Sequence, residues 1–241
     1  MGGPRMALVS MSMAGLLGWA IVSAQSYPHA FPRDGVVKLF ENERVTIWEV
    51  NWKRGVPQPM HRHISDMAGA YLRYGPVAVT TIEQEAAGKP LPPAVPFDVP
   101  RPYFGLKGVT HREVDNGGPG DPERLAIMVD LREGYVPTPF APKAGLEPAF
   151  PRVGAKDVLD NERVRIWDYS WPPARPLAQH VHDKDSVEIF FEGGTIVSKS
   201  ADGREDRKTW AFKSARFVPR GLVDTEEAVF GTPRAMIIEL K

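Results

Sequence analysis

The chain has 241 residues, and its 30 Lys and Arg balance its 30 Asp and Glu, so the formal net charge is zero. A nucleic-acid-binding protein normally carries a clustered basic excess, which this composition lacks. The absence of cysteine excludes disulfides, thiolate metal sites and a cysteine nucleophile. An apolar fraction of 42% is typical of a globular protein, and 24 prolines favour short strands and turns over long helices.

The amino-terminal segment has the layout of a secretory signal peptide. A short basic start ending at Arg5 is followed by residues 6–22, which carry no charge, and then by the small residues Ser23 and Ala24. A membrane anchor is the alternative, but a span needs about 20 residues, so the uncharged run is short. We therefore predict a signal peptide over 1–24, cleavage after Ala24, no stable membrane span thereafter, and a secreted or periplasmic protein.

An internal repeat determines the predicted domain organisation. Residues 31–75 align without gaps on 150–194, and sixteen of these forty-five positions are identical. The ends of the two units also correspond, with AIMVDL at 126–131 and AMIIEL at 235–240. A duplicated unit is the explanation that fits this similarity. The predicted domains are 25–132 and 150–241, joined by a linker over 133–149.

Each unit is predicted to be all-β. In 44–52 the side chains of Trp48, Val50 and Trp52 fall on one face of a strand, because successive residues alternate between faces. The repeat of this pattern at 163–171 indicates that these tryptophans fill the interior of a barrel. Further predicted strands, rich in β-branched and aromatic residues, are 70–82, 124–131, 188–200 and 234–240. Residues 86–100 form a proline-rich loop.

The chemistry is expected at the histidines. A His-x-His pair occurs at His61 and His63 and again, at the equivalent place in the second unit, at His180 and His182. On a strand both members of such a pair point the same way, so both imidazoles can reach one ion. Neutral imidazole suits iron, zinc, copper, nickel and, less specifically, manganese.

These motifs resemble those of the cupin superfamily. A glycine, five residues and His61-x-His63 follow the first cupin motif, and Gly108-Val-Thr-His111 matches the core of the second. In the second unit, the stretch from Pro219 to Asp224 follows the second motif with aspartate in place of histidine. The chain therefore resembles a bicupin, which implies two tandem jelly-roll (double-stranded β-helix) barrels.

The glutamate that completes most cupin metal sites is missing from its usual place. Those positions hold Met67 and Ala68 in the first unit, and the nearest acid, Asp66, is one residue too early. The resemblance then implies a three-histidine site made by His61, His63 and His111, with open positions for water or substrate. In the second unit, His180, His182 and Asp224 either imitate a two-histidine, one-carboxylate triad or form a decayed site in which Asp224 caps a turn.

Two classes of function stay open. One is a metal-dependent exported protein that binds or converts a small molecule, as an oxygenase or isomerase of the cupin type would. The other is a non-catalytic ligand-binding or structural bicupin without a functional metal. Homo-oligomer formation is compatible with either. Arginines near the motifs, at 62, 73 and 112, are expected to form surface ion pairs, with contact to an anionic substrate as the alternative. Acid pairs such as Glu226 and Glu227 are expected at solvated edges.

Overall fold

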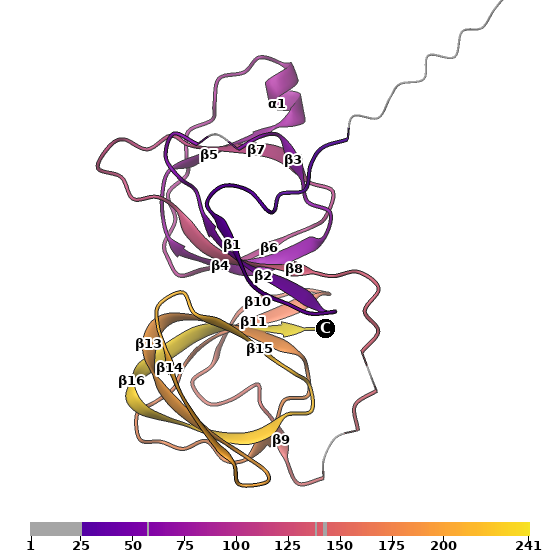
Figure 1. Cartoon of the computed structure of the whole chain (residues 1–241), viewed down its shortest axis with the longest axis vertical. Helices are drawn as coiled ribbons and strands as arrows, with labels where there is room; N and C mark the ends of the chain where they lie inside the picture. Colours follow the sequence, from indigo (N-terminus) through magenta and orange to yellow (C-terminus); the bar gives the residue numbers. More distant parts are fainter. Residues whose placement is uncertain (1–25, 57, 138, 142–143) are drawn as a thin grey trace, which may run out of the picture.

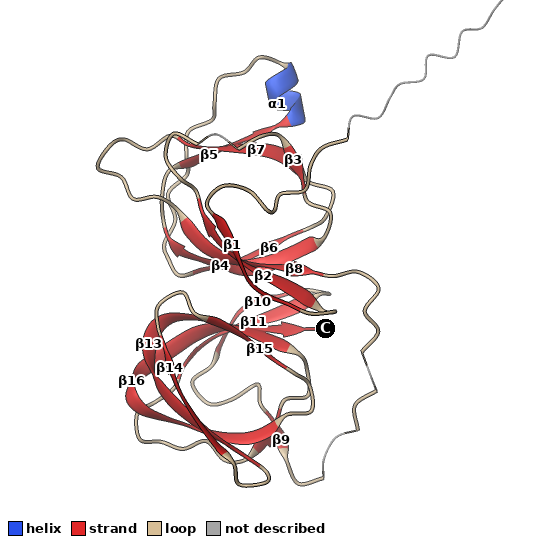
Figure 2. Ribbon diagram, in the orientation of Figure 1, coloured by secondary structure: helices blue, strands red, loops and turns tan. Residues whose placement is uncertain are grey.

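The computed structural model describes residues 26–56, 58–137, 139–141 and 144–241, so the predicted signal peptide lies outside the described residues. Two curled units of β-strands are stacked on one another along the long axis (Figure 1). Helix is confined to the short α1 (Ile82–Ala86) within this part of the chain (Figure 2). No described helix has the length and apolar content needed to cross a membrane. The all-β prediction is confirmed.

The first barrel consists of two sheets that face each other. The larger sheet has the order β1-β2-β8-β4-β6, and the smaller has the order β3-β7-β5. The strands of the larger sheet are β1 (Val36–Glu41), β2 (Val45–Asn51), β4 (Asp66–Arg73), β6 (Arg101–Gly105) and β8 (Leu125–Leu131). Those of the smaller sheet are β3 (His61–Arg62), β5 (Val77–Thr81) and β7 (Thr110–Asp115). All the pairings are antiparallel, as a jelly roll requires.

The second barrel repeats this arrangement with two long, bent strands. Strands β13 (Ser186–Ser200) and β16 (Val223–Leu240) pair with each other along their length and take part in both faces of the barrel. The remaining strands are β9 (Glu147–Pro148), β10 (Lys156–Asp160), β11 (Val164–Ser170), β12 (His180–Val181), β14 (Glu205–Trp210) and β15 (Ala215–Val218). Strand β9 lies near the end of the segment that follows β8. It pairs with β12 and is therefore part of the sheet of the second barrel.

Strand β2 shows why both faces of these strands are apolar. Trp48 and Val50 point into the interior of the first barrel, in agreement with the alternation in the sequence. Val45 and Ile47, on the opposite face, are fully buried in a cluster that also contains residues of the second barrel. The large sheet is therefore covered on both sides, which explains its nearly continuous hydrophobic runs.

The two barrels share a hydrophobic interface with reciprocal ion pairs at its edge. Phe40 of the first barrel stacks on Phe217 of the second, with ring centroids 5.7 Å apart. Arg44 Nε lies 3.7 Å from Asp185 Oδ2, and the equivalent residues exchange roles, with Arg163 Nε 3.3 Å from Asp66 Oδ2. The duplicated units thus meet through the same side chains, in the manner of a two-fold symmetric dimer.

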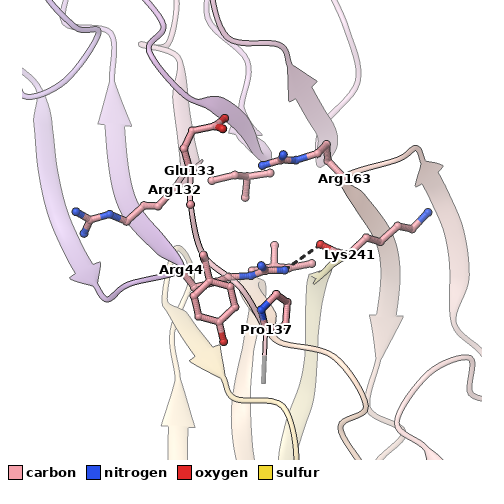
Figure 3. Close-up of a pocket in the computed structure, with 10 residues that line it drawn as sticks. Arg44, Arg132, Glu133, Pro137, Arg163 and Lys241 are labelled. Carbon is pink, nitrogen blue, oxygen red and sulfur yellow. Dashed lines mark hydrogen bonds between the residues drawn. The ribbon is translucent and has the colours of Figure 1, made fainter. Parts of the chain in front are cut away.

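A cavity of about 150 Å³ lies beside this interface, where the chain that follows β8 passes the second barrel (Figure 3). Its cations have protein partners. Arg44 donates to the Lys241 carbonyl over 3.0 Å, Arg163 pairs with Asp66, and the Lys241 ammonium pairs with Asp160. The first two contacts join the barrels and the third lies within the second barrel, so the charged groups of this cavity belong to the interface and its edge.

Candidate metal centre

Strand pairing brings together the three histidines that the first-barrel motifs predicted. Strand β3 pairs antiparallel with β7, and in this register His61 lies directly opposite His111. His63 follows two residues after His61 and points to the same side. His61 and His63 are buried and His111 is partly buried. Nitrogen atoms of the three rings lie within 4.8 Å of one another.

A tight turn before β7 holds this register. The amide of Gly108 donates to the His63 carbonyl over 2.7 Å, and the His63 amide donates to the Val109 carbonyl over 2.9 Å. Gly108 has φ of 89°, in the left-handed region that favours glycine. Asp66 belongs to this turn, because its Oδ1 accepts from the Lys107 amide over 2.9 Å. It is therefore a cap of the turn, and it lies outside the histidine group.

The lone pair of His61 Nε2 is free to bind an ion, and the other two imidazoles approach each other at a distance that suits one. His61 Nδ1–H donates to the Pro59 carbonyl over 3.0 Å, which leaves Nε2 as the acceptor; that atom is buried and has no hydrogen-bond partner among the described residues. His63 Nε2 and His111 Nε2 are 3.2 Å apart. Two imidazoles bound to one ion at about 2.0–2.1 Å place their nitrogens about 2.9–3.4 Å apart in octahedral or tetrahedral geometry. The donor set therefore fits a first-row transition metal.

Burial keeps these imidazoles neutral. It lowers the pKa of His61 and of His63 to about 4, with a further contribution from the neighbouring imidazoles, and burial also lowers the pKa of His111. A metal binds only the neutral form of histidine, so the site is ready for an ion at neutral pH without the loss of a proton.

A buried carboxylate that the motif comparison missed lies next to the histidines. Glu113 follows His111 by two residues on β7, and its Oε1 is 3.9 Å from His111 Nε2. Its Oε2 pairs with Arg33 Nη1 at 2.9 Å. Burial alone would raise the pKa of Glu113, but the positive charge of Arg33, together with His111, His61 and Trp52, outweighs it and the pKa falls to about 2. The carboxylate is thus ionised at the edge of a histidine-lined cavity of about 20 Å³, enough for one water-sized particle.

The second barrel also brings its predicted residues together. In β12 and β16, His180 lies opposite Asp224. Asp224 Oδ1 is 3.3 Å from His180 Nε2 and 3.5 Å from His182 Nε2. The alternative in which Asp224 caps a turn is wrong, since this residue lies within a strand and faces both imidazoles. Its turn is capped instead by Asp185, whose Oδ1 accepts from the Arg220 amide.

The interior of the second barrel is occupied by an ion-pair network. Glu226, expected at a solvated edge, is fully buried and pairs with Arg152 Nη1 at 2.9 Å and with Arg216 Nη2 at 2.8 Å. Arg216 Nε also donates to Glu188 over 2.6 Å. The prediction for Glu226 was wrong because Glu and Arg can enter a core as mutually paired charges, which polarity alone does not reveal.

The equivalent positions of the first barrel carry no charged pair. Glu188 and Arg216 are register partners between β13 and β15, and their counterparts between β4 and β6 are Gly69 and Tyr103. The charged pair of the second barrel is therefore replaced by a residue without a side chain and an aromatic ring. A Cβ at Gly69 would collide with the Ile127 carbonyl oxygen, so no side chain fits there.

The other candidate residues lie away from both groups. His29 pairs with Asp130, with Nε2 to Oδ2 at 3.3 Å. Arg112 Nε is 3.6 Å from Glu85 in an exposed pair, as expected for a surface arginine. Arg62 and Arg73 are also exposed. The signal that could have identified Glu113 and Glu226 is their shared position, two residues after the last ligand of each motif.

Comparison with known proteins yields structural similarity only. No protein-family model and no curated protein sequence matches the chain. AerE from Microcystis aeruginosa is 10% identical over 90% of this chain and 99% of its own, with a TM-score of 0.56. Bacillus subtilis oxalate decarboxylase, which has Mn(II) centres, is 11% identical over 86% of this chain and 72% of its own, with a TM-score of 0.53.

A variant of salicylate 1,2-dioxygenase from Pseudoaminobacter salicylatoxidans is also similar. It is 9% identical over 82% of this chain and 71% of its own, with a TM-score of 0.51. At such low identities the likeness establishes the fold. Together with the duplicated motifs and the two stacked β-barrels, it shows that this chain has a bicupin fold.

Proposed function

We propose that the first barrel binds one divalent first-row transition ion through His61, His63 and His111, and that a small molecule is bound or converted beside it. The observation that carries the proposal is the convergence of three largely buried imidazoles, with His61 Nε2 lacking any hydrogen-bond partner among the described residues. Iron, manganese, zinc, copper and nickel all accept such ligands. The Mn(II) centres of the similar oxalate decarboxylase make manganese one of the metals to test first.

A bound ion there would supply Lewis-acid polarisation of a substrate oxygen or of a water. The chain's own residues contribute the rest of the environment. The three histidines leave coordination positions open, and Glu113, held ionised by Arg33, is a negative charge on the wall of the same cavity. A carboxylate so placed can orient a bound water or accept a hydrogen bond from a ligand.

We assign a structural role to the second barrel. Asp224 Oδ1 lies 3.3 Å from His180 Nε2 and 3.5 Å from His182 Nε2, and the network of Arg152, Arg216 and Glu226 occupies the interior beside them. The support for this assignment is that buried ion-pair network, which occupies the interior where a ligand would have to lie.

The matched substitutions His61→Ala and His180→Ala test both assignments. Metal analysis of the purified protein should find near-stoichiometric first-row metal in the wild type and in His180→Ala, and none in His61→Ala. A metal-free wild type that His61→Ala leaves unchanged would overturn the proposal. Where metal is present, melting shifts with small molecules followed by turnover assays on the hits distinguish a catalyst from a binding protein, which is the second candidate function.

Export is a separate part of the proposal and rests on the sequence of residues 1–24. The full chain expressed in a bacterial host should accumulate outside the cytoplasm. Mass spectrometry should find Gln25 at its amino terminus. A product in the cytoplasm that retains Met1 or Gly2 would contradict this assignment.

A further inference from the structure

A large cavity opens beside the candidate metal centre, under the proline-rich loop 86–100. Its volume is about 790 Å³, within the range of small-molecule sites. Tyr71 and Tyr103 line both this cavity and the small histidine-lined cavity, so the two adjoin through these rings. The other walls are mostly apolar and are formed by β5, β6 and the loop, with Phe97 as the main aromatic residue of the loop.

The charged residues that line this cavity are all cations. They are Arg101, which is exposed, and Arg124, which is 6% exposed, and no Asp or Glu is among the lining residues described. Arg124 Nε donates to the Gly75 carbonyl over 2.9 Å. Its guanidinium lies 5.1 Å from the centroid of Phe97 and 5.6 Å from that of Tyr71.

Arg124 has no ion-pair partner within the described residues. The carboxylates of Glu113 and Asp115 contribute to the electrostatic environment of Arg124, but both lie more than 4 Å from its guanidinium. Their ion-pair partners are Arg33 and Arg54, respectively. Since a guanidinium stays charged inside proteins, Arg124 is a buried charge whose remaining N–H groups have aromatic faces but no anion.

This situation differs from that of the other buried arginines. Arg33, Arg152 and Arg216 each contact a carboxylate at 2.9 Å or less. Burial of an unpaired charge is costly, and such groups are normally paired or bind a ligand. A planar fork of N–H donors suits a carboxylate, which it can bind through two parallel hydrogen bonds.

The duplication adds an internal comparison. Trp52 and Trp171 are equivalent, and their amides donate to the carbonyls of Arg124 and Pro233 respectively. The position of Arg124 is therefore occupied in the second barrel by a residue that cannot bind an anion. At this equivalent position the guanidinium is therefore present in the barrel that has the three histidines and absent from the other.

We propose that this cavity binds a small organic carboxylate with an apolar body, the carboxylate on the guanidinium of Arg124 and the body against Tyr71, Phe97 and Tyr103. This inference rests on the proposed function, which identifies the site. It goes further by naming the class of ligand. The carboxylate end lies in the large cavity, so the apolar body can extend along the shared tyrosines toward the histidines.

Matched pairs of probes test the assignment in the wild-type protein. Calorimetric titrations with benzoate, octanoate and 2-naphthoate are each compared with the corresponding neutral amide, in metal-free and metal-loaded protein. The charge-assisted contact should make the carboxylates bind roughly 10- to 100-fold more tightly than the amides. If no carboxylate exceeds its amide, or if none binds, the proposal is overturned.

Variants then locate the contact. Arg124→Gln should abolish the preference for carboxylates, whereas Arg73→Gln, an exposed arginine outside the cavity, should retain it. Phe97→Ala should weaken the binding of carboxylate and amide alike. This variant still tests whether the ligand lies in this cavity if Arg124→Gln does not fold. A carboxylate preference that survives in folded Arg124→Gln would refute the assigned anchor.

One further variant distinguishes this inference from the proposed function. His61→Ala should lose its metal but keep the carboxylate preference, since Arg124 does not depend on an ion. A protein that binds metal without any carboxylate preference would refute only the ligand assignment. A protein that prefers carboxylates but binds no metal would refute only the metal assignment.

Discussion

Replacement of Arg33 by methionine should strongly destabilise the first barrel and should do so in a pH-dependent manner. Arg33 Nη1 lies 2.9 Å from Glu113 Oε2, with both side chains at most one-tenth exposed. Methionine retains most of the apolar length of arginine but removes the charge, so Glu113 is left as a buried carboxylate without its partner. Removal of one member of a buried pair typically costs about 3–5 kcal/mol.

The pKa of Glu113 provides an independent magnitude. It is lowered from 4.5 to about 2, which corresponds to roughly 3 kcal/mol of stabilisation at neutral pH. That contribution is fully present above pH 4.5 and is lost as the pH falls toward 2. In Arg33→Met the largest contribution that lowers the pKa of Glu113 is gone while burial still raises that pKa, so acidification relieves the unpaired charge.

Urea unfolding of metal-free protein at pH 7 and at pH 5 measures both effects. The free-energy difference between wild type and Arg33→Met should be about 3 kcal/mol at pH 7 and clearly smaller at pH 5. The double variant Arg33→Met, Glu113→Gln should recover part of the loss at pH 7. An equal difference at both pH values, with no recovery in the double variant, would show that Arg33 acts through packing and would refute the electrostatic reasoning.

Three further outcomes are expected. The pKa of His61 and of His63 is lowered from 6.5 to about 4, so the unfolded chain takes up protons first as the pH falls. The free energy of unfolding of the metal-free protein, measured in urea, should therefore fall between pH 6.5 and 4 by at most roughly 3 kcal/mol per histidine, and by less in His61→Gln. A flat profile would contradict this. Gly108→Ala should cost about 1 kcal/mol in urea unfolding through strain at positive φ, and an unchanged midpoint would mean that the turn adjusts freely. Asp66→Ala should cost about 1–3 kcal/mol, because the Lys107 amide and Arg163 both lose their acceptor, whereas Asp66→Asn, which can still accept from that amide, should cost less.

The sequence by itself determined the fold class and the location of the histidine group. The alternation of side chains around Trp48 and Trp167 predicted the barrel interiors. The similarity of residues 31–75 to residues 150–194 predicted the duplication of the barrel. His61 and His63 were found from sequence because a local spacing of two residues on a strand places side chains on one side. His111 was added from the motif order, and the pairing of β3 with β7 brought it opposite His61.

Only the tertiary structure decided which polar groups were paired. Asp66 lies next to the histidine motif in sequence but caps a turn, and Glu226 looked like a surface residue but is the centre of a buried ion-pair network. Arg124 gave no signal in the sequence at all. Its significance depends on whether a carboxylate from elsewhere in the chain lies within reach, and such long-range pairing is set by packing, which local spacing does not encode.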